Sequence, residues 1–399
     1  MKRLQWSLLA GLLSLTHVWV QAQAQAQAQT QTQTQTAAET LPVAKDLHEV
    51  VFKVPVSVQD LYGRREQRQI PVTVFKPAGD GPFPMVVFNH GRATSREKMA
   101  QPSRFRYEQQ ARYLVGKGFV VMVPTRAGYG ETFDGFDPES NGGCSQPRIE
   151  PMSLAASDQV LAVAEFARSL SYVDATRWWV MGQSVGGLTA VATVARKPPG
   201  LQGAVNFSGG TGGDPVGRPG RSCAVDQIGR LWKTWGAQSQ TPMLWLYWEN
   251  DLFWGPQAPR DWHRAWVEGG GQAEFHQLAP VGQDGHSGFS LDMDRWTPLV
   301  DAFLAKAGFT QAALPPVPEP SDFAQIDQID KVPVGAETRQ NLYTRFLASP
   351  LPRAFAIGPG GAGFATGDWA VGRALGFCQA RRGIKCKLYA VDNQVVWRN

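Results

Sequence analysis

Between residues 50 and 308, short apolar runs alternate with longer segments in which apolar residues recur at helical spacing. The first two runs, Val50–Val58 and Gln69–Lys76, flank Tyr62-Gly63 and predict two strands joined by a turn. The later runs are continuously apolar, which is typical of central strands buried on both faces. These predicted strands are Met85–Phe88, Phe119–Val123, Trp178–Met181, Ala204–Phe207, Met243–Trp248 and Ala273–Leu278.

The segments between these runs have the three- and four-residue spacing of amphipathic helices. The predicted helices are Arg104–Lys117, Met152–Leu170, Val185–Arg196, Pro259–Val267 and Trp296–Ala307. The glycine-rich stretch Ser208–Gly236 is interpreted as an insertion. Strands that alternate with helices predict an α/β fold with a doubly wound, mostly parallel sheet covered by helices on both faces. We place this domain at residues 46–310.

The C-terminal quarter has a different organisation. A proline-rich stretch predicts an extended linker at residues 311–322, and residues 323–399 predict a small α+β module. Its glycine-rich segment Gly358–Gly363 lacks the lysine-serine ending of a phosphate-binding loop and is interpreted as a turn. The predicted elements of the module are the helices Gly335–Ala348 and Asp368–Arg381, the strand Arg353–Ile357, and a hairpin of Lys387–Val391 and Val395–Trp397.

The N-terminus has the features of a secretory signal. Two basic residues precede the apolar run Leu4–Val20, and Ala22 and Ala24 offer small residues for cleavage, so we expect a signal peptide at residues 1–22. An uncleaved membrane anchor is the alternative. Residues 23–45 are rich in Gln, Ala and Thr and predict a disordered spacer. The mature protein is therefore expected in the periplasm or outside the cell, without a stable membrane span.

Charge and cysteine content narrow the possible partners. The net charge is +5, but no basic run is interleaved with aromatic residues, so no nucleic-acid partner is expected. In an exported protein the four cysteines favour disulfides, and the preferred pairing keeps each bond within its own region. The predicted disulfides are Cys144–Cys223 and Cys378–Cys386. Neither pair has the spacing of a tetrahedral metal site, and no metal or cofactor is expected.

A candidate nucleophile lies between a predicted strand and a predicted helix. The sequence Gly182-Gln183-Ser184-Val185-Gly186 has the Gly-x-Ser-x-Gly pattern of a sharp turn that exposes a serine hydroxyl. Serine needs a base to accept its proton and an acid to hold that base. In a doubly wound hydrolase the order along the chain is serine, acid, histidine.

Elimination identifies the base. His286 lies on a glycine-rich loop just after the last predicted strand, where a loop can direct its ring. The other histidines precede the serine or fall within a helix or strand pattern: His17, His48, His90, His263 and His276.

Asp251 is the preferred acid because it ends the strand that begins at Met243. Glu249 is the alternative, and Asp284 is expected to orient the histidine loop. For the oxyanion we predict the backbone N–H of Val185 and a second N–H from Arg92, with Ala93 as the alternative. His90 is expected to pack and to orient that loop.

Several residues near this site are candidates for binding substrate. Trp232, Trp235 and Trp254 would form aromatic walls for an apolar or aromatic group, with ordinary core packing as the alternative. Arg126 would bind a carboxylate, with structural pairing to an acidic residue as the alternative.

Four short motifs occur together in order: Asn89-His90-Gly91, Gly182-Gln183-Ser184-Val185-Gly186, Tyr247-Trp248-Glu249-Asn250-Asp251 and Asp284-Gly285-His286. Over about Val50–Gly308 this arrangement resembles the dienelactone hydrolase-like group of the α/β-hydrolase superfamily. The resemblance implies an α/β-hydrolase fold and hydrolase activity. Ser184 stands where the founding enzyme has cysteine, which favours hydrolysis of carboxylic esters. The segment containing Cys378 and Cys386 resembles a small module appended to bacterial exported proteins.

The sequence thus predicts an exported serine hydrolase that cleaves a small-molecule carboxylic ester through an acyl-enzyme. Two alternatives stay open. One is a peptidase of the prolyl-oligopeptidase type, which shares the order of the triad. The other is a cell-envelope binding protein in which the C-terminal module acts and the hydrolase fold is a scaffold.

Overall fold

The computed structural model describes residues 44–101, 103–309, 317–367, 370–379 and 385–398. The predicted signal peptide and the predicted spacer up to residue 43 lie outside the described residues, as do residues 310–316 around the start of the predicted linker. Across the described ranges, no helix combines the length and the apolar character needed to cross a membrane.

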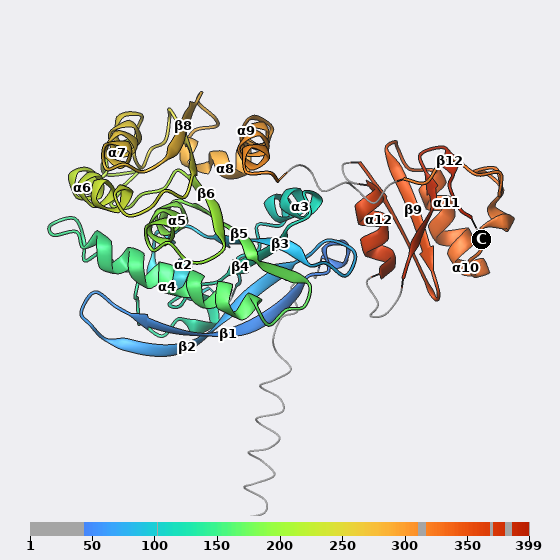
Figure 1. Cartoon of the computed structure of the whole chain (residues 1–399), viewed down its shortest axis with the longest axis horizontal. Helices are drawn as coiled ribbons and strands as arrows, with labels where there is room; N and C mark the ends of the chain where they lie inside the picture. The colour runs from blue at the N-terminus through green and yellow to red at the C-terminus, as the bar shows by residue number, and fades with distance from the viewer. Residues whose placement is uncertain (1–43, 102, 310–316, 368–369, 380–384, 399) are drawn as a thin grey trace, which may run out of the picture. The chain divides into compact units, whose positions relative to one another are not determined.

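Eight strands form one sheet in the order β1-β2-β4-β3-β5-β6-β7-β8 (Figure 1). Strand β2 is antiparallel to its neighbours β1 and β4, whereas the other adjacent pairs are parallel. This order and direction are those of the α/β-hydrolase fold, so the predicted fold class is confirmed. The bounds are β1 Val50–Gln59, β2 Arg65–Phe75, β3 Phe83–Asn89, β4 Val120–Pro124, β5 Val173–Gln183, β6 Leu201–Phe207, β7 Met243–Trp248 and β8 Ala273–Leu278.

Helices connect these strands, and each helix predicted from the sequence in this part of the chain is present. Helix α6 was not predicted, because it lies in a segment that was interpreted as an insertion. The bounds are α2 Arg96–Ala100, α3 Glu108–Gly116, α4 Ile149–Ala167, α5 Val185–Ala195, α6 Val225–Gly236, α7 Gln257–Glu268, α8 Gly288–Leu291 and α9 Met293–Lys306. Short 3-10 turns are η1 Lys45–Leu47, η2 Gly130–Thr132 and η3 Gly285–Ser287.

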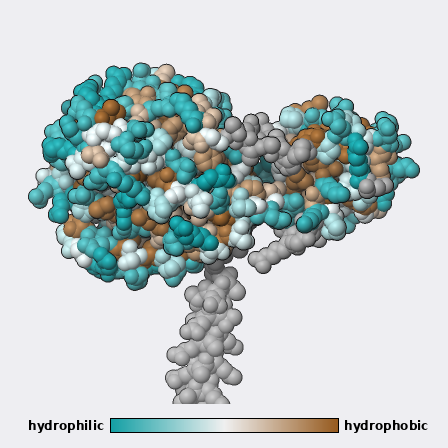
Figure 2. Space-filling view, in the orientation of Figure 1, coloured by the Kyte–Doolittle hydropathy of each residue, from teal (hydrophilic) through white to brown (hydrophobic). Residues whose placement is uncertain are grey.

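Successive side chains of the central strands enter two different apolar cores. In β3, Met85 and Val87 join the core that contains residues of α4, α5, α6 and α7, whereas Val86 and Phe88 join the core that contains residues of α3 and α9. Burial on both faces explains why these strands read as continuous apolar runs. The face of the molecule in Figure 2 is largely hydrophilic, with apolar side chains in separate patches.

Helix α5, which follows the candidate nucleophile, is buried along its whole length. Its small side chains allow the close packing, and its hydroxyls are satisfied internally. Thr189 donates to the carbonyl of Val185 at 2.7 Å, and Thr193 donates to the carbonyl of Thr189 at 2.8 Å. The start of this helix is therefore fixed by packing on every side.

The C-terminal segment forms a second, antiparallel sheet in the order β10-β9-β11-β12, which agrees with a small α+β module. Strand β10 was not predicted: Gly358 and Gly361 pair across a tight turn, and the glycines after it continue as a strand. Both predicted disulfides, Cys144–Cys223 and Cys378–Cys386, are present. The bounds are η4 Ile329–Lys331, α10 Ala336–Thr338, the π-helix η5 Arg339–Tyr343, α11 Thr344–Leu347, β9 Arg353–Gly358, β10 Gly361–Thr366, α12 Ala370–Gln379, β11 Lys387–Val391 and β12 Gln394–Val395.

Candidate active site

Ser184 occupies a strained turn between β5 and α5. Its φ of 59° and ψ of −123° lie in a region that non-glycine residues rarely adopt. The flanking glycines allow this turn, since a Cβ on Gly182 would collide with the carbonyl of Gly186, and a Cβ on Gly186 would collide with the carbonyl of Asn89. Local backbone geometry thus agrees with a nucleophile elbow.

His286 and Asp251 form a buried pair. The Nδ1 of His286 lies 2.9 Å from Oδ2 of Asp251, and the two residues are 8% and 2% exposed. The other carboxylate oxygen, Oδ1, accepts the backbone N–H groups of Phe253 at 2.8 Å and of Trp254 at 3.1 Å. With Nδ1–H donated to the carboxylate, Nε2 of the neutral imidazole is the nitrogen that can accept a proton.

The structure brings Asp251 to His286 and leaves the alternative acid, Glu249, exposed. Asp284 holds the histidine loop, as expected. Its Oδ1 accepts the backbone N–H of His286 and that of Leu252, each at 2.9 Å. The loops that carry the acid and the base are therefore joined through one carboxylate.

The loop after β3 lies against the serine. A Cβ on Gly91 would lie 3.1 Å from Cβ of Ser184 and 2.8 Å from Oε1 of Gln183, so only glycine fits without displacing them. His90 is fully buried, and its ring stacks on Phe105 with centroids 3.7 Å apart.

The contacts of His90 define its tautomer. Nε2 accepts the backbone N–H of Arg126 at 3.1 Å, so Nδ1 carries the proton and donates to the carbonyl of Gly91 at 2.7 Å. Burial, together with the charge of Arg126, holds the pKa of His90 well below its usual value. Because a trans peptide is planar, the carbonyl of Gly91 and the N–H of Arg92 point in opposite directions. His90 thus directs the Arg92 N–H away from its own ring.

Val185 is the first residue of α5. Its N–H has no acceptor inside the helix, because the first four N–H groups of any helix lack one. The N–H groups of Gly187 and Leu188 are already used, each donating to the carbonyl of Ser184. The N–H of Val185 at the start of α5 thus agrees with its predicted role, and the N–H of Arg92 as the second oxyanion donor stays a prediction.

Three candidate substrate contacts were predicted wrongly. Trp232 is fully buried, with its ring against Trp245 and Trp262, and Trp235 is only 4% exposed in the same core. Arg126 is also fully buried, and its Nε donates to Glu139 at 2.6 Å. The alternatives, core packing for the tryptophans and structural pairing for the arginine, describe them correctly.

Trp254 is buried in the same core at 3% exposed, so its prediction as a substrate contact is wrong as well, but it also contacts the candidate base. Its ring meets the imidazole of His286 edge-on, with centroids 5.4 Å apart. The side chain of Arg92 makes a two-point ion pair with Asp137. The ion pair occupies the guanidinium. The predicted donation to the oxyanion concerns only the backbone N–H of Arg92.

Sequence reasoning missed Tyr107, which directly precedes α3. Its ring packs against Phe88 and Phe289. Burial raises the pKa of Tyr107 to about 12, so the hydroxyl stays protonated. Its φ of 47° is unusual for tyrosine, and no sequence pattern marks such a position.

The described part of the chain holds no group of three or more His, Cys, Asp or Glu side chains arranged to bind a metal ion. The cysteines are all in disulfides.

No family model matches the chain, and no curated protein matches it. Among solved structures, it is similar to a putative dienelactone hydrolase from Klebsiella pneumoniae, with 17% identity, a TM-score of 0.42, and coverage of 65% of this chain and 99% of that one. Esterase 2 of Thermogutta terrifontis gives 17% identity and a TM-score of 0.43, with 65% and 95% covered.

An acylaminoacyl peptidase from Pyrococcus horikoshii gives 15% identity and a TM-score of 0.45, with coverage of 69% of this chain and 43% of the peptidase. This chain thus matches less than half of the length of that peptidase. At these identities and TM-scores the likenesses carry no argument about chemistry, which depends on the geometry of the site.

Proposed function

We propose that this protein is an exported serine hydrolase that cleaves a small-molecule carboxylic ester through an acyl-enzyme. One observation carries the proposal: the buried Asp251–His286 pair, with Nδ1 2.9 Å from the carboxylate, in the same site as a serine on a strained strand-to-helix turn. An acid, a base and a serine nucleophile are the groups that acyl transfer requires.

In the first half of the reaction, Ser184 Oγ attacks the acyl carbon while Nε2 of His286 accepts its proton. The N–H groups of Val185 and Arg92 bind the oxyanion of the tetrahedral intermediate. Asp251 stabilises the imidazolium. His286 then gives the proton to the departing alkoxide, and an alcohol leaves.

In the second half, water attacks the acyl-enzyme and His286 accepts a proton from it. The tetrahedral intermediate collapses, the proton returns to Ser184, and a carboxylic acid is released. Each cycle consumes one water and leaves the enzyme unchanged.

The preference for an ester is supported by the resemblance to dienelactone hydrolase-like enzymes together with serine in place of cysteine. Export is supported by the two disulfides, since such bonds persist in oxidising compartments. The predicted signal peptide is part of the proposal and lies outside the described residues.

A fluorophosphonate probe tests the proposal, because it phosphonylates only an activated serine. We expect labelling at Ser184 in the parent and none in Ser184→Ala, which should also lower ester turnover by about 10⁶-fold. A matched ester and amide with the same acyl group then separate an esterase from a peptidase. A parent protein that is not labelled would favour the binding-protein alternative.

A further inference from the structure

Two aromatic rings enclose the candidate base. The ring of Phe253 stacks on the imidazole of His286 with centroids 4.0 Å apart and planes 28° apart, and Trp254 meets it edge-on. The backbone N–H groups of the same two residues hold Asp251. One short loop thus binds the acid through its backbone and encloses the base with its side chains.

These rings are supported from behind by the glycine-rich segment 209–213. A Cβ on Gly213 would lie 2.8 Å from Cβ of Phe253 and 2.8 Å from the Trp254 ring, and a Cβ on Gly210 would lie 3.1 Å from the Trp254 ring. The indole Nε1 of Trp254 also donates to the carbonyl of Ser208 at 2.8 Å. The glycines are needed because the rings lie directly on this backbone.

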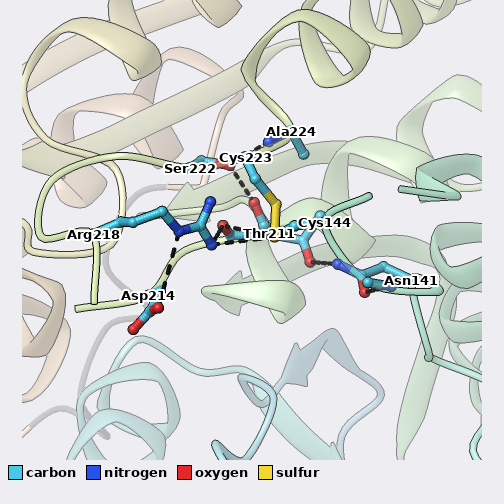
Figure 3. Close-up of a disulfide and its surroundings, with 10 residues drawn as sticks. Asn141, Cys144, Thr211, Asp214, Arg218, Ser222, Cys223 and Ala224 are labelled. Carbon is cyan, nitrogen blue, oxygen red and sulfur yellow. Dashed lines mark hydrogen bonds and ion pairs between the residues drawn. A yellow bond between two sulfur atoms is a disulfide. The ribbon is translucent and has the colours of Figure 1, made fainter. Parts of the chain in front are cut away.

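A disulfide anchors the supporting segment (Figure 3). The N–H of Cys223 donates to the carbonyl of Gly212 at 2.9 Å, and Cys223 is bonded to Cys144. Beside the disulfide, Asn141 Nδ2 donates to Thr211 Oγ1 at 3.3 Å, and Ser222 Oγ donates to the carbonyl of Thr211 at 2.7 Å. The disulfide thus ties Cys223, whose backbone N–H is hydrogen-bonded to Gly212 of segment 209–213, to the loop that follows β4.

We propose that Phe253 and Trp254 are positioning residues for His286, and that the Cys144–Cys223 disulfide keeps them in place by anchoring segment 209–213. This inference rests on the proposed function. Glycine has more backbone freedom than any other residue, so a segment this rich in glycine stays ordered only if it is tied down. The disulfide therefore makes full activity depend on an oxidising compartment.

The same disulfide reaches the other side of the site. The loop that carries Cys144 also carries Asp137 and Glu139, and Arg92 donates to the side chain of Asp137 and to the carbonyl of Glu139. Loss of the Cys144–Cys223 disulfide is therefore expected to displace segment 209–213, which supports the rings beside His286. The loop that contains Arg92 is expected to be affected less.

The experiment compares two disulfide-free variants with the parent. In Cys144→Ser/Cys223→Ser we expect kcat on an ester to fall about tenfold, with KM changed less, because misplacement of a catalytic group by about 1 Å costs up to about 10²-fold in rate. The matched control, Cys378→Ser/Cys386→Ser, removes a disulfide far along the chain and should keep the parental kcat. Circular dichroism at the assay temperature checks that each variant is folded.

A second series begins with variants that keep the disulfide, and these do not depend on the folding of the cysteine variant. With the disulfide intact, Phe253→Leu should lower kcat. Phe253→Tyr retains the ring, so its kcat should stay close to that of the parent. In the Cys144→Ser/Cys223→Ser background, Phe253→Leu should cost less than in the parent, because the ring is already displaced.

The outcomes separate the two proposals. Parental kcat in both Phe253→Leu and Cys144→Ser/Cys223→Ser overturns this inference. Losses in kcat that are fully additive when the two changes are combined also overturn it. Both outcomes leave the proposed function standing. A parent that fails to label at Ser184 overturns the proposed function and this inference with it.

Discussion

The side-chain amide of Gln183 donates a hydrogen bond to the backbone carbonyl of His286 at 3.1 Å. The residue before the candidate nucleophile thus holds the loop of the candidate base, although they are 103 positions apart in the sequence. Its Oε1 lies on the side of Gly91, in the loop proposed to bind the oxyanion. The side chain of Gln183 therefore lies between the loop of His286 and the loop of Gly91, and both loops must keep a fixed distance from Ser184.

Replacing Gln183 with Leu preserves most of the side-chain volume and removes the hydrogen bond to His286. We expect kcat to fall about tenfold, because the base loses one support and misplacement of a catalytic group by about 1 Å costs up to about 10²-fold. Steady-state kinetics on an ester measure the change. Gln202→Leu is the control, since Gln202 makes the same type of bond to the carbonyl of Gly200. Equal kcat values for the two variants would contradict this role.

Substitutions of the two candidate acids, Asp251 and Glu249, are expected to have different effects. Asp251→Asn should lower kcat by about 10³- to 10⁴-fold, because an amide no longer holds His286 in the tautomer that leaves Nε2 free. Glu249→Gln should keep the parental rate, since Glu249 is exposed. The rate of phosphonylation by a fluorophosphonate measures the effect independently of the substrate. The opposite result, with Glu249→Gln inactive, would assign the acid to the other carboxylate.

The contacts of His90 predict an effect on rate without a role in proton transfer. His90→Phe retains a ring to stack on Phe105 and removes the bond that orients the carbonyl of Gly91. Because the Arg92 N–H then loses its fixed direction, we expect kcat to fall by about 10²-fold, the order of losing one oxyanion donor, with a smaller change in KM. Phe105→Leu disturbs the stacking and keeps both ring hydrogen bonds, so its kcat should remain close to that of the parent. Similar losses of kcat in both variants would mean that His90 acts only through packing.

Most of the sheet could be predicted from the sequence, because strands buried on both faces leave continuous apolar runs. Helix α6 was missed even though Ile228, Trp232 and Trp235 have helical spacing, since the glycine-rich segment before it suggested one long irregular insertion. Strand β10 was missed for a related reason: glycine marks both turns and closely packed strands, and only pairing with β9 distinguishes them.

The site shows a similar division. Ser184, Asp251 and His286 could be proposed as a triad because their order along the chain and their positions near the ends of predicted strands can be read from the sequence. Trp232 and Trp254 look alike in sequence and both are buried in the same core, but Trp254 also contacts the imidazole of His286, and this difference depends on which neighbours the fold supplies. The contacts of Gln183 and Phe253 with His286 were not predicted, because contacts across the site leave no pattern in the sequence.

His48 makes stability depend on pH. It follows η1 with a φ of 48°, its Nε2 is buried without a partner among the described residues, and burial, followed by the charge of Lys76, lowers its pKa from 6.5 to about 4. Between pH 6.5 and about pH 4, His48 is therefore protonated in the unfolded chain but neutral in the folded protein. The stability contributed by neutral His48 is fully present above pH 6.5 and is lost as the pH falls towards 4.

Replacing His48 with Asn removes this titration and retains a residue that tolerates the left-handed backbone. A shift of this size corresponds to at most about 3 kcal/mol, and we expect about 2 kcal/mol because the site is partly screened by solvent. Urea unfolding at pH 7.5 and pH 4.5 measures it: between the two, the parent should lose about 2 kcal/mol more than His48→Asn. Equal losses in the two proteins would mean that acid destabilises the fold through other groups, of which His90, with its pKa lowered by burial, is the first to test by the same comparison.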